Sequence, residues 1–283
     1  MKQPNIYAFA DEAGKAFPSQ LAAMRRNGLQ GLEIRGVDGQ NVSELSTEKA
    51  KELRRQMDDN GLITWSVGSP IGKVWLQEDW NAHLDKLRHT LQIANILGAQ
   101  KLRMFSFFMP KNEDPSAYRG EVMDRLAQML EVAKGSGTQL LHENEKGIYG
   151  DVADRCLDIH TQLPELKGIF DPANFVQCGE DTLRAWEMLK EHIVYLHIKD
   201  ALPEGIVAPA GKGVGNVAAT IKDFLARGGN AMTLEPHLKT FEGLKKLEEA
   251  GNTEHIGKYF AYPTADAAFD AACNALREIL EEM

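Results

Sequence analysis

Eight short runs of apolar or β-branched residues recur along the 283-residue chain, and stretches with helical spacing lie between them. Successive runs are about 33 residues apart on average, which is the length of one strand–helix unit. The runs are Asn5–Phe9, Gly31–Arg35, Ile63–Val67, Leu102–Phe107, Gln139–Glu143, Gly168–Asp171, Ile193–Lys199 and Ala231–Glu235. Eight such units predict a (β/α)8 TIM barrel, an α/β fold that needs roughly 250 residues.

The segments between the runs carry apolar residues on one helical face. Three such stripes are Val122, Leu126, Met129 and Ala133; Val217, Ile221, Phe224 and Leu225; and Phe269, Ala272, Leu276 and Ile279. Glycine favours the left-handed conformation at a helix exit, which predicts helix ends at Asn27-Gly28, Asn60-Gly61, Leu97-Gly98 and Arg227-Gly228-Gly229. Ser46 or Thr47, followed by Glu48, is typical of a helix cap.

A doubly wound open sheet is the alternative architecture. That fold usually has a glycine-rich phosphate fingerprint after its first strand, whereas the first run here continues into Ala8-Phe9-Ala10-Asp11-Glu12. Because the composition does not change abruptly anywhere, we expect one domain over residues 1–283. Within it, Thr240–Pro263 is expected to be an irregular insert before the last helix.

Charge and cysteine content narrow the range of partners. The net charge of −9 disfavours nucleic acid, which is bound through many Lys and Arg contacts to phosphate. Cys156, Cys178 and Cys273 have no paired spacing, which fits a reducing compartment and a cytoplasmic location. No apolar run is long enough for a signal peptide or a membrane span, so we expect no membrane partner.

Four runs end in residues that bind metals. Active side chains of such barrels lie at the carboxyl ends of the strands. Glu143, Asp171, His197 and Glu235 end the fifth to eighth runs, so we expect them at one rim. Three converging carboxylates would repel one another unless a cation lies among them. The donor set suits one divalent ion, Mn²⁺, Mg²⁺, Co²⁺ or Zn²⁺.

Simpler interpretations stay open for single residues. Asp171 precedes a proline and could cap the next helix, and His197 alone could be a hydrogen-bonded core histidine. Glu145 has the same strand parity as Glu143 and competes with it, although Glu143 lies closer to the apolar part of the run. The metal interpretation rests on four such residues in successive units.

Further residues near these strand ends are candidates for binding substrate. Lys199 and His237 lie beside the metal candidates. Glu33 and Arg35 share one strand face and could hold substrate hydroxyls or form an ion pair at the barrel mouth. Lys212 lies in Gly211-Lys212-Gly213-Val214-Gly215, which could bind phosphate through its backbone amides or could be a flexible turn.

Several motifs resemble one family across nearly the whole chain. Those motifs are Gly31-Leu32-Glu33-Ile34-Arg35-Gly36, His142-Glu143-Asn144-Glu145, Phe170-Asp171-Pro172-Ala173-Asn174-Phe175, Leu196-His197-Ile198-Lys199-Asp200 and Leu234-Glu235-Pro236-His237. They resemble the xylose-isomerase-like sugar phosphate isomerase/epimerase family, which is also named after endonuclease IV. The resemblance implies a TIM barrel in which Glu143, Asp171, His197 and Glu235 hold one divalent metal.

Two branches of that family differ from this chain. In the ketose 3-epimerase branch a substrate-contacting histidine follows the metal aspartate by three residues, and an arginine follows the metal histidine by six. Those positions here are Asn174, kept as a substrate-binding candidate, and Pro203. The endonuclease branch uses three zinc ions and more histidines than these motifs supply.

The expected activity is proton transfer on a small sugar or sugar phosphate. In an isomerase or epimerase of this kind, one of Glu143 and Glu235 removes a proton beside a carbonyl and the other returns it, through a metal-stabilised enediolate. A metal-dependent dehydratase of a cyclic polyol ketone (an inosose) is one alternative, and a non-catalytic sugar-binding barrel is another. The expected partner is a small-molecule sugar, and the chain could form a homo-oligomer.

Overall fold

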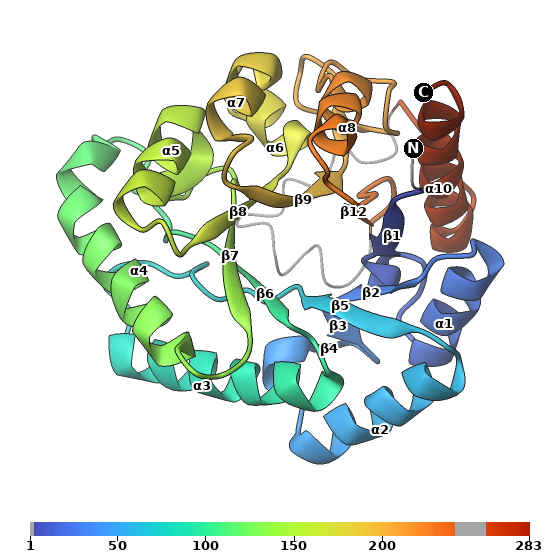
Figure 1. Cartoon of the computed structure of the whole chain (residues 1–283), viewed down its shortest axis with the longest axis horizontal. Coiled ribbons are helices and arrows are strands. Elements are labelled where there is room, and N and C mark those ends of the chain that lie inside the picture. Colours follow the sequence, from blue (N-terminus) through green and yellow to red (C-terminus); the bar gives the residue numbers. More distant parts are fainter. Residues whose placement is uncertain (1–2, 241–258) are drawn as a thin grey trace.

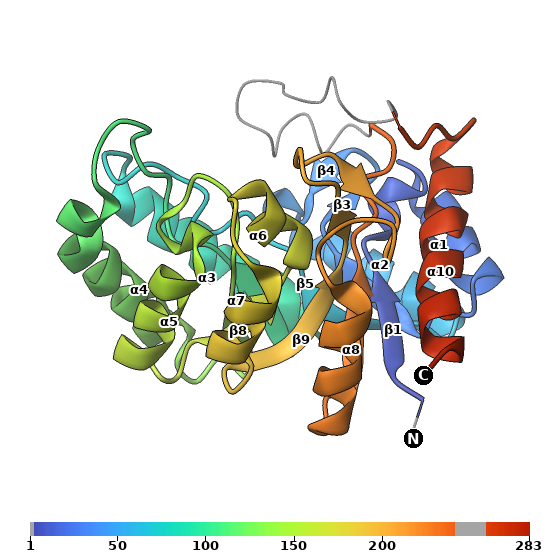
Figure 2. The same ribbon diagram turned by 90° about the horizontal axis from the view of Figure 1, so that it is seen from above.

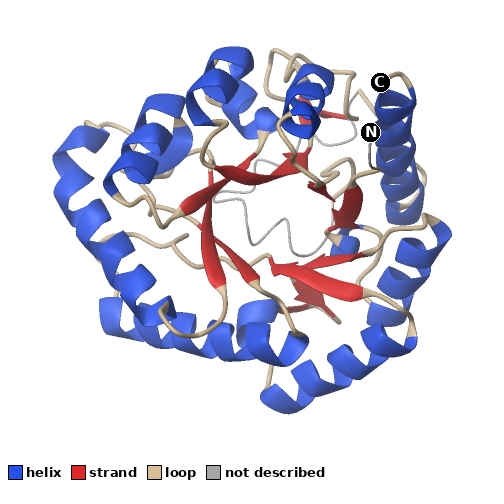
Figure 3. Cartoon of the chain, in the orientation of Figure 1, coloured by secondary structure: helices blue, strands red, loops and turns tan. Residues whose placement is uncertain are grey.

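Eight parallel strands close into a barrel in the computed structural model, which describes residues 3–240 and 259–283. Around the barrel the strands follow the order β1-β12-β9-β8-β7-β6-β5-β2. Figure 3 shows these strands in red inside a ring of blue helices. They are β1 (Asn5–Ala8), β2 (Gly31–Ile34), β5 (Ile63–Val67), β6 (Lys101–Met104), β7 (Gln139–Glu143), β8 (Lys167–Phe170), β9 (Ile193–Ile198) and β12 (Ala231–Leu234). The fold is therefore the predicted single TIM barrel, and the open-sheet alternative is wrong.

Helices surround the barrel on the outside (Figure 1). They are α1 (Phe17–Arg26), α2 (Thr47–Asp59), α3 (Trp80–Leu97), α4 (Arg119–Ala133), α5 (Ala153–Gln162), α6 (Pro172–Gln177), α7 (Thr182–Leu189), α8 (Val217–Ala226) and α10 (Ala265–Glu281). Two hairpins, β3 (Gly36–Val37) with β4 (Gln40–Asn41) and β10 (Asp200–Ala201) with β11 (Val207–Ala208), follow β2 and β9. In the side view of Figure 2, the β3–β4 hairpin and the N-terminus lie at opposite ends of the molecule.

Some predicted strand boundaries match the structure and others do not. Ile63–Val67 and Gln139–Glu143 are strands residue for residue. The predicted run Leu102–Phe107 leaves the barrel after Met104. Beyond it, the amide of Phe105 donates to Ile71 O at 2.8 Å and that of Phe107 donates to Gly72 O at 2.9 Å. This chain segment therefore pairs with a loop in place of a barrel strand.

The predicted helix faces and helix ends are confirmed. The three stripes are buried, apart from the half-buried Leu225. Gly28, Gly61, Gly98 and Gly228 all have positive φ. Ser46 caps α2 by accepting a hydrogen bond from the amide of Lys49.

Two further expectations concern the connection after β8 and the insert before the last helix. The expected single helix per connection is wrong after β8, where the short α6 precedes α7, because Asp171 and Pro172 start a helix directly at the strand end. Most of the expected insert Thr240–Pro263 lies outside the described residues, and its described part, 240 and 259–263, holds no helix or strand.

Inward-facing side chains form layers inside the barrel. Tyr7, Leu141, Ile169, Tyr195 and Ala231 make one apolar layer. Side chains alternate along a strand, so positions two residues further on face the same interior, nearer the carboxyl end. Leu141 is followed in this way by Glu143, Ile169 by Asp171, and Tyr195 by His197. The apolar layer thus forms the floor beneath a layer of ionisable groups.

None of the helices in the described part of the chain combines the length and apolar character needed to cross a membrane.

Candidate metal centre

Four residues at the carboxyl ends of neighbouring strands converge as the sequence predicted. Glu143 ends β7, Asp171 follows β8, His197 lies in β9 and Glu235 follows β12. Each offers one ligand atom, and these atoms lie within 4.8 Å of one another. All four residues are buried. The parity of the strands therefore delivers three carboxylates and one imidazole to one point inside the barrel mouth.

His197 is the centre of this cluster. Its Nδ1 atom lies 2.8 Å from Glu143 Oε1 and 3.5 Å from Glu235 Oε2. Its Nε2 atom lies 3.0 Å from Glu33 Oε2, and Glu33 Oε1 accepts a hydrogen bond of 2.9 Å from the Tyr195 hydroxyl. Glu33 therefore holds the far side of the imidazole ring, so that Nδ1 faces the other carboxylates.

Three buried cations balance the carboxylates. Lys199 Nζ lies 3.0 Å from Asp171 Oδ2 and 3.1 Å from Glu235 Oε2. Arg103 Nη1 lies 3.1 Å from Glu143 Oε2 and 3.6 Å from Glu235 Oε1. Arg35 Nη1 donates to Glu235 Oε1 at 2.9 Å. Arg103 therefore lies between the two glutamates that the sequence analysis selected as acid and base.

Arg103 is a site residue that the sequence analysis missed. A signal was present, because a charged residue interrupts the apolar run Leu102-Arg103-Met104. Burial of a charge in a strand requires a partner of opposite charge. The identity of that partner depends on how the barrel closes, so the run alone could not supply it.

The pKa values of the cluster reflect burial opposed by neighbouring charges. Burial and the repulsion from Glu235 and Glu143 raise the pKa of Asp171 to about 7, against the effect of Lys199. Burial also opposes ionisation of Glu235, but Lys199, His237 and His197 hold its pKa well below the usual range. Burial lowers the pKa of His197, but Glu143 and Glu33 outweigh it and raise that pKa well above the usual value.

The donor set fits a divalent metal ion. Glu143 Oε2 and Asp171 Oδ2 are buried and lie in ion pairs with Arg103 and Lys199, but neither accepts a hydrogen bond of good geometry from the described residues, so both keep lone pairs for a further ligand. One imidazole nitrogen with carboxylate oxygens suits Mn²⁺, Mg²⁺, Co²⁺ or Zn²⁺. Glu143, Asp171, His197 and Glu235 are the residues that would hold the ion.

Asp171 combines the two interpretations that the sequence left open. Its Oδ1 atom accepts a hydrogen bond of 2.9 Å from the amide of Asn174 and caps α6, while Oδ2 faces Lys199. The Asn174 side chain donates to Asn144 O at 2.9 Å. The amide group of Asn174 therefore holds the loop beside Asp171, and its contact with substrate stays a prediction.

The other predicted substrate contacts are largely committed to protein groups. Glu33 and Arg35 do not form the expected ion pair with each other. Glu33 is hydrogen-bonded to His197 and Tyr195. Arg35 forms ion pairs with Asp11 and Glu12, which follow β1, and with Glu235. Glu145, the competitor of Glu143, lies 2.7 Å from Lys73 Nζ. The choice of Glu143 for the cluster therefore agrees with the structure.

His237 differs from these residues because its side chain reaches the solvent, with 13% of its surface exposed. Its backbone has a φ of 46°, and its amide donates to Glu12 Oε2 at 2.6 Å. Its Nε2 atom lies 3.5 Å from Glu235 Oε1. His237 is thus the predicted substrate contact that connects the buried cluster with the outside.

Comparison with known proteins agrees with this geometry. Residues 21–281 match the family described as xylose isomerase-like TIM barrel. The chain belongs to this family. No curated protein matches the sequence.

Solved structures of this family superpose over almost the full chain. A probable 3-DHS dehydratase of Bacillus anthracis is 16% identical, with a TM-score of 0.73, 97% of this chain covered and 98% of that one. A D-psicose 3-epimerase of Clostridium cellulolyticum H10, with D-tagatose, is 14% identical, with a TM-score of 0.72 and 98% of each chain covered. The IolI protein with a bound zinc atom is 13% identical, with a TM-score of 0.73 and 98% of each chain covered. At these identities the likeness shows the fold.

The glycine-rich loop of this family member has an unexpected role. The amides of Gly211, Gly213 and Gly215 donate to the Asp200 carboxylate at 3.0, 3.0 and 2.8 Å. The interpretation that these amides bind a phosphate is therefore wrong. The alternative of a flexible turn does not account for these hydrogen bonds, which hold the loop around Asp200. The side chain of Lys212 is exposed on this loop.

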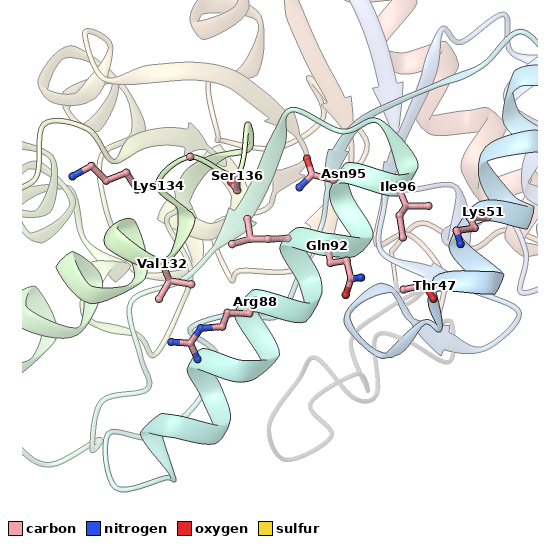
Figure 4. A pocket seen from close by; sticks show the side chains of 11 residues that line it. Thr47, Lys51, Arg88, Gln92, Asn95, Ile96, Val132, Lys134 and Ser136 are labelled. Atoms are coloured by element: carbon pink, nitrogen blue, oxygen red, sulfur yellow. The ribbon is translucent and has the colours of Figure 1, made fainter.

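A wide depression on the outer helices offers no comparable chemistry (Figure 4). It has a volume of about 680 Å³ and lies over α2, α3 and the end of α4. Its polar lining includes Lys51, Gln92 and Asn95, without histidine or carboxylate. The barrel mouth is therefore the candidate site.

Proposed function

We propose that this barrel is a divalent-metal-dependent isomerase or epimerase of a small sugar or sugar phosphate. The single observation that carries the proposal is the convergence of Glu143 and Glu235 on one imidazole nitrogen, 2.8 and 3.5 Å from it, with Arg103 Nη1 near the other oxygen of each glutamate. Two carboxylates that enter the site from different strands, β7 and β12, could exchange protons with the two faces of one carbon atom. A protein that only binds a sugar has no need of this arrangement.

The two glutamates would act as base and acid in turn. One ionised carboxylate accepts the proton from the carbon beside the substrate carbonyl, and the other, carrying a proton from solvent, returns a proton. Arg103 holds Glu143 Oε2 and Arg35 holds Glu235 Oε1, while the other oxygen of each glutamate faces His197 Nδ1. A divalent ion held by the cluster would act as a Lewis acid on the substrate carbonyl.

His237 would connect the pair with bulk water. It is partly exposed and lies 3.5 Å from Glu235 Oε1, so its ring is placed to pass protons between solvent and that carboxylate. Burial and the charge of Lys199 hold the pKa of His237 well below the usual value, which keeps the ring neutral.

A dehydratase of a cyclic polyol ketone is the second candidate, supported by the likeness to a probable 3-DHS dehydratase. Its reaction starts with the same proton abstraction, after which a hydroxyl group leaves as water from the adjacent carbon. The product mass separates the two reactions, because only dehydration loses water.

Hydrogen exchange tests the proposal directly. Ketoses, aldoses and inososes are incubated in heavy water with Mn²⁺, Mg²⁺, Co²⁺ or Zn²⁺, and the substrate C–H signals are followed by NMR. We expect deuterium to enter beside the carbonyl of one substrate class, and a chelator to stop it. A sugar that binds without exchange under every metal would instead support a non-catalytic binding barrel.

A further inference from the structure

The glycine-rich loop after β11 surrounds an anion that belongs to the protein itself. Besides the amides of Gly211, Gly213 and Gly215, the amide of Ala201 donates to Asp200 at 2.8 Å. Asp200 is 1% exposed. Four backbone N–H groups directed at one anion form the arrangement with which other proteins cradle phosphate. In this chain a buried carboxylate takes that position.

The loop is shaped around the carboxylate. A Cβ atom at Gly213 would lie 2.4 Å from Asp200 Oδ1, and one at Gly215 would lie 2.7 Å from the same atom. Both distances are too short for real contacts, so glycine is required for the amides to approach Asp200. A phosphoryl group cannot share these donors, because it would bring a second anion to the one already there.

Four cations in the described part of the mouth are committed in the same way. Arg35 contacts Asp11, Glu12 and Glu235, and Lys73 lies 2.7 Å from Glu145 Oε2. Arg103 and Lys199 contact the carboxylates of the cluster. Each of these side chains is largely or wholly buried in its ion pair. Releasing one to bind a substrate anion would leave a buried carboxylate without its partner, which is strongly unfavourable.

The charge balance leads to the same conclusion. Six acids lie around three cations at the mouth. The cations are Arg35, Arg103 and Lys199, and the acids are Asp11, Glu12, Glu33, Glu143, Asp171 and Glu235. Among these described residues the acids outnumber the three cations two to one, and each of the three cations is already paired with an acid.

We propose that the substrate is an uncharged polyhydroxy ketone or aldehyde, without a phosphate or carboxylate group. This inference rests on the proposed function and narrows its substrate class. The carboxylate-rich mouth suits such a molecule, because ionised carboxylates are acceptors for its hydroxyl protons. The enzyme would then distinguish substrates by the positions of their hydroxyl groups and not by a phosphate or carboxylate group.

A matched pair of substrates tests the inference. The same ketose is supplied with and without a phosphate group, and deuterium exchange is compared under one metal. We expect kcat/KM to be at least about 100-fold higher for the uncharged member, since one lost ion-pair partner is worth that much. A preference for the phosphorylated member would overturn the inference and leave the proposed function standing. Exchange in neither member, over the whole panel, would count against the proposed function itself.

Inorganic phosphate gives a second readout that does not depend on turnover. The melting temperature of the wild-type protein should not change with phosphate, whereas that of Asp200→Ala should rise, because its vacated amides can bind the ion. Lys212→Ala, on the same loop, is the matched control and should behave as wild type. A phosphate-induced rise in the wild-type melting temperature, together with competitive inhibition of exchange, would overturn the inference even if Asp200→Ala fails to fold.

Discussion

Two buried histidines in different regions of the molecule have opposite pKa shifts. His197 lies inside the barrel mouth, where Glu143 and Glu33 overcome the effect of burial and raise its pKa well above the usual value. His160 lies on α5, outside the barrel, with Nδ1 2.7 Å from Leu166 O and its ring stacked on His192. Burial lowers the pKa of His160 to about 4, and His192 and Lys167 add to this effect.

The difference teaches what makes the barrel mouth a functional region. Burial by itself yields a neutral, packed histidine, as at His160. The mouth instead holds more acids than bases, and this surplus of negative charge gives His197 its basicity and favours a cation. The predictions below test this contrast, in order of decreasing expected effect.

The largest effect is expected from the two glutamates of the cluster, Glu143 and Glu235. Glu143→Gln and Glu235→Gln should each lower the rate of substrate deuterium exchange by about 10²–10⁴-fold, because an amide cannot accept the proton. Glu145→Gln is the control, since Glu145 lies further along the same segment and pairs with Lys73. Wild-type exchange in both variants would show that neither glutamate transfers the proton.

Arg103 should matter next, through stability. Arg103→Met leaves Glu143 and Glu235 without the cation between them, so the free energy of unfolding should fall by about 3–5 kcal/mol in urea with a chelator present. Added divalent metal should recover part of this loss. Arg184→Met removes the exposed pair with Asp154, and should cost less than about 1 kcal/mol. If Arg103→Met and Arg184→Met lowered the free energy of unfolding equally, the inferred surplus of acids at the mouth would be contradicted.

The packed histidine predicts a pH effect outside the mouth. The pKa of His160 is about 4 when folded and 6.5 when unfolded, so the unfolded chain binds the extra proton between these values. Its contribution to stability is therefore complete above pH 6.5 and is lost as the pH falls toward 4, by up to about 3 kcal/mol. Denaturation from pH 7 to 4 should show a shallower loss in His160→Gln. An unchanged slope would mean that His160 does not titrate in this way.

A smaller effect is expected from Glu33. This residue holds Nε2 of His197, and Glu33→Gln should weaken binding of Mn²⁺ or Zn²⁺ about 10–100-fold, because it removes the charge that orients the ring. Calorimetric titration measures the change without any substrate. Tyr195→Phe, which removes only the hydrogen bond to Glu33, should have a smaller effect. Unchanged affinity in Glu33→Gln would leave Glu33 a purely structural role.

The sequence alone determined the barrel and the four converging residues. Periodic apolar runs located all eight strands, and the ends of the last four runs placed Glu143, Asp171, His197 and Glu235 at one rim. Both depend on local spacing, which the chain carries directly. The same reasoning located helix exits such as Gly98, where a left-handed residue is required.

Only the tertiary structure decided which charges neutralise one another. Arg103 lies between two glutamates that belong to strands far apart in the sequence, and Asp200 occupies the ring of amides that resembled a phosphate site. Asn174 holds its own loop, although its position suggested contact with substrate. Spacing specifies the face on which a side chain lies, but a buried charge selects its partner through distances that arise when the barrel closes.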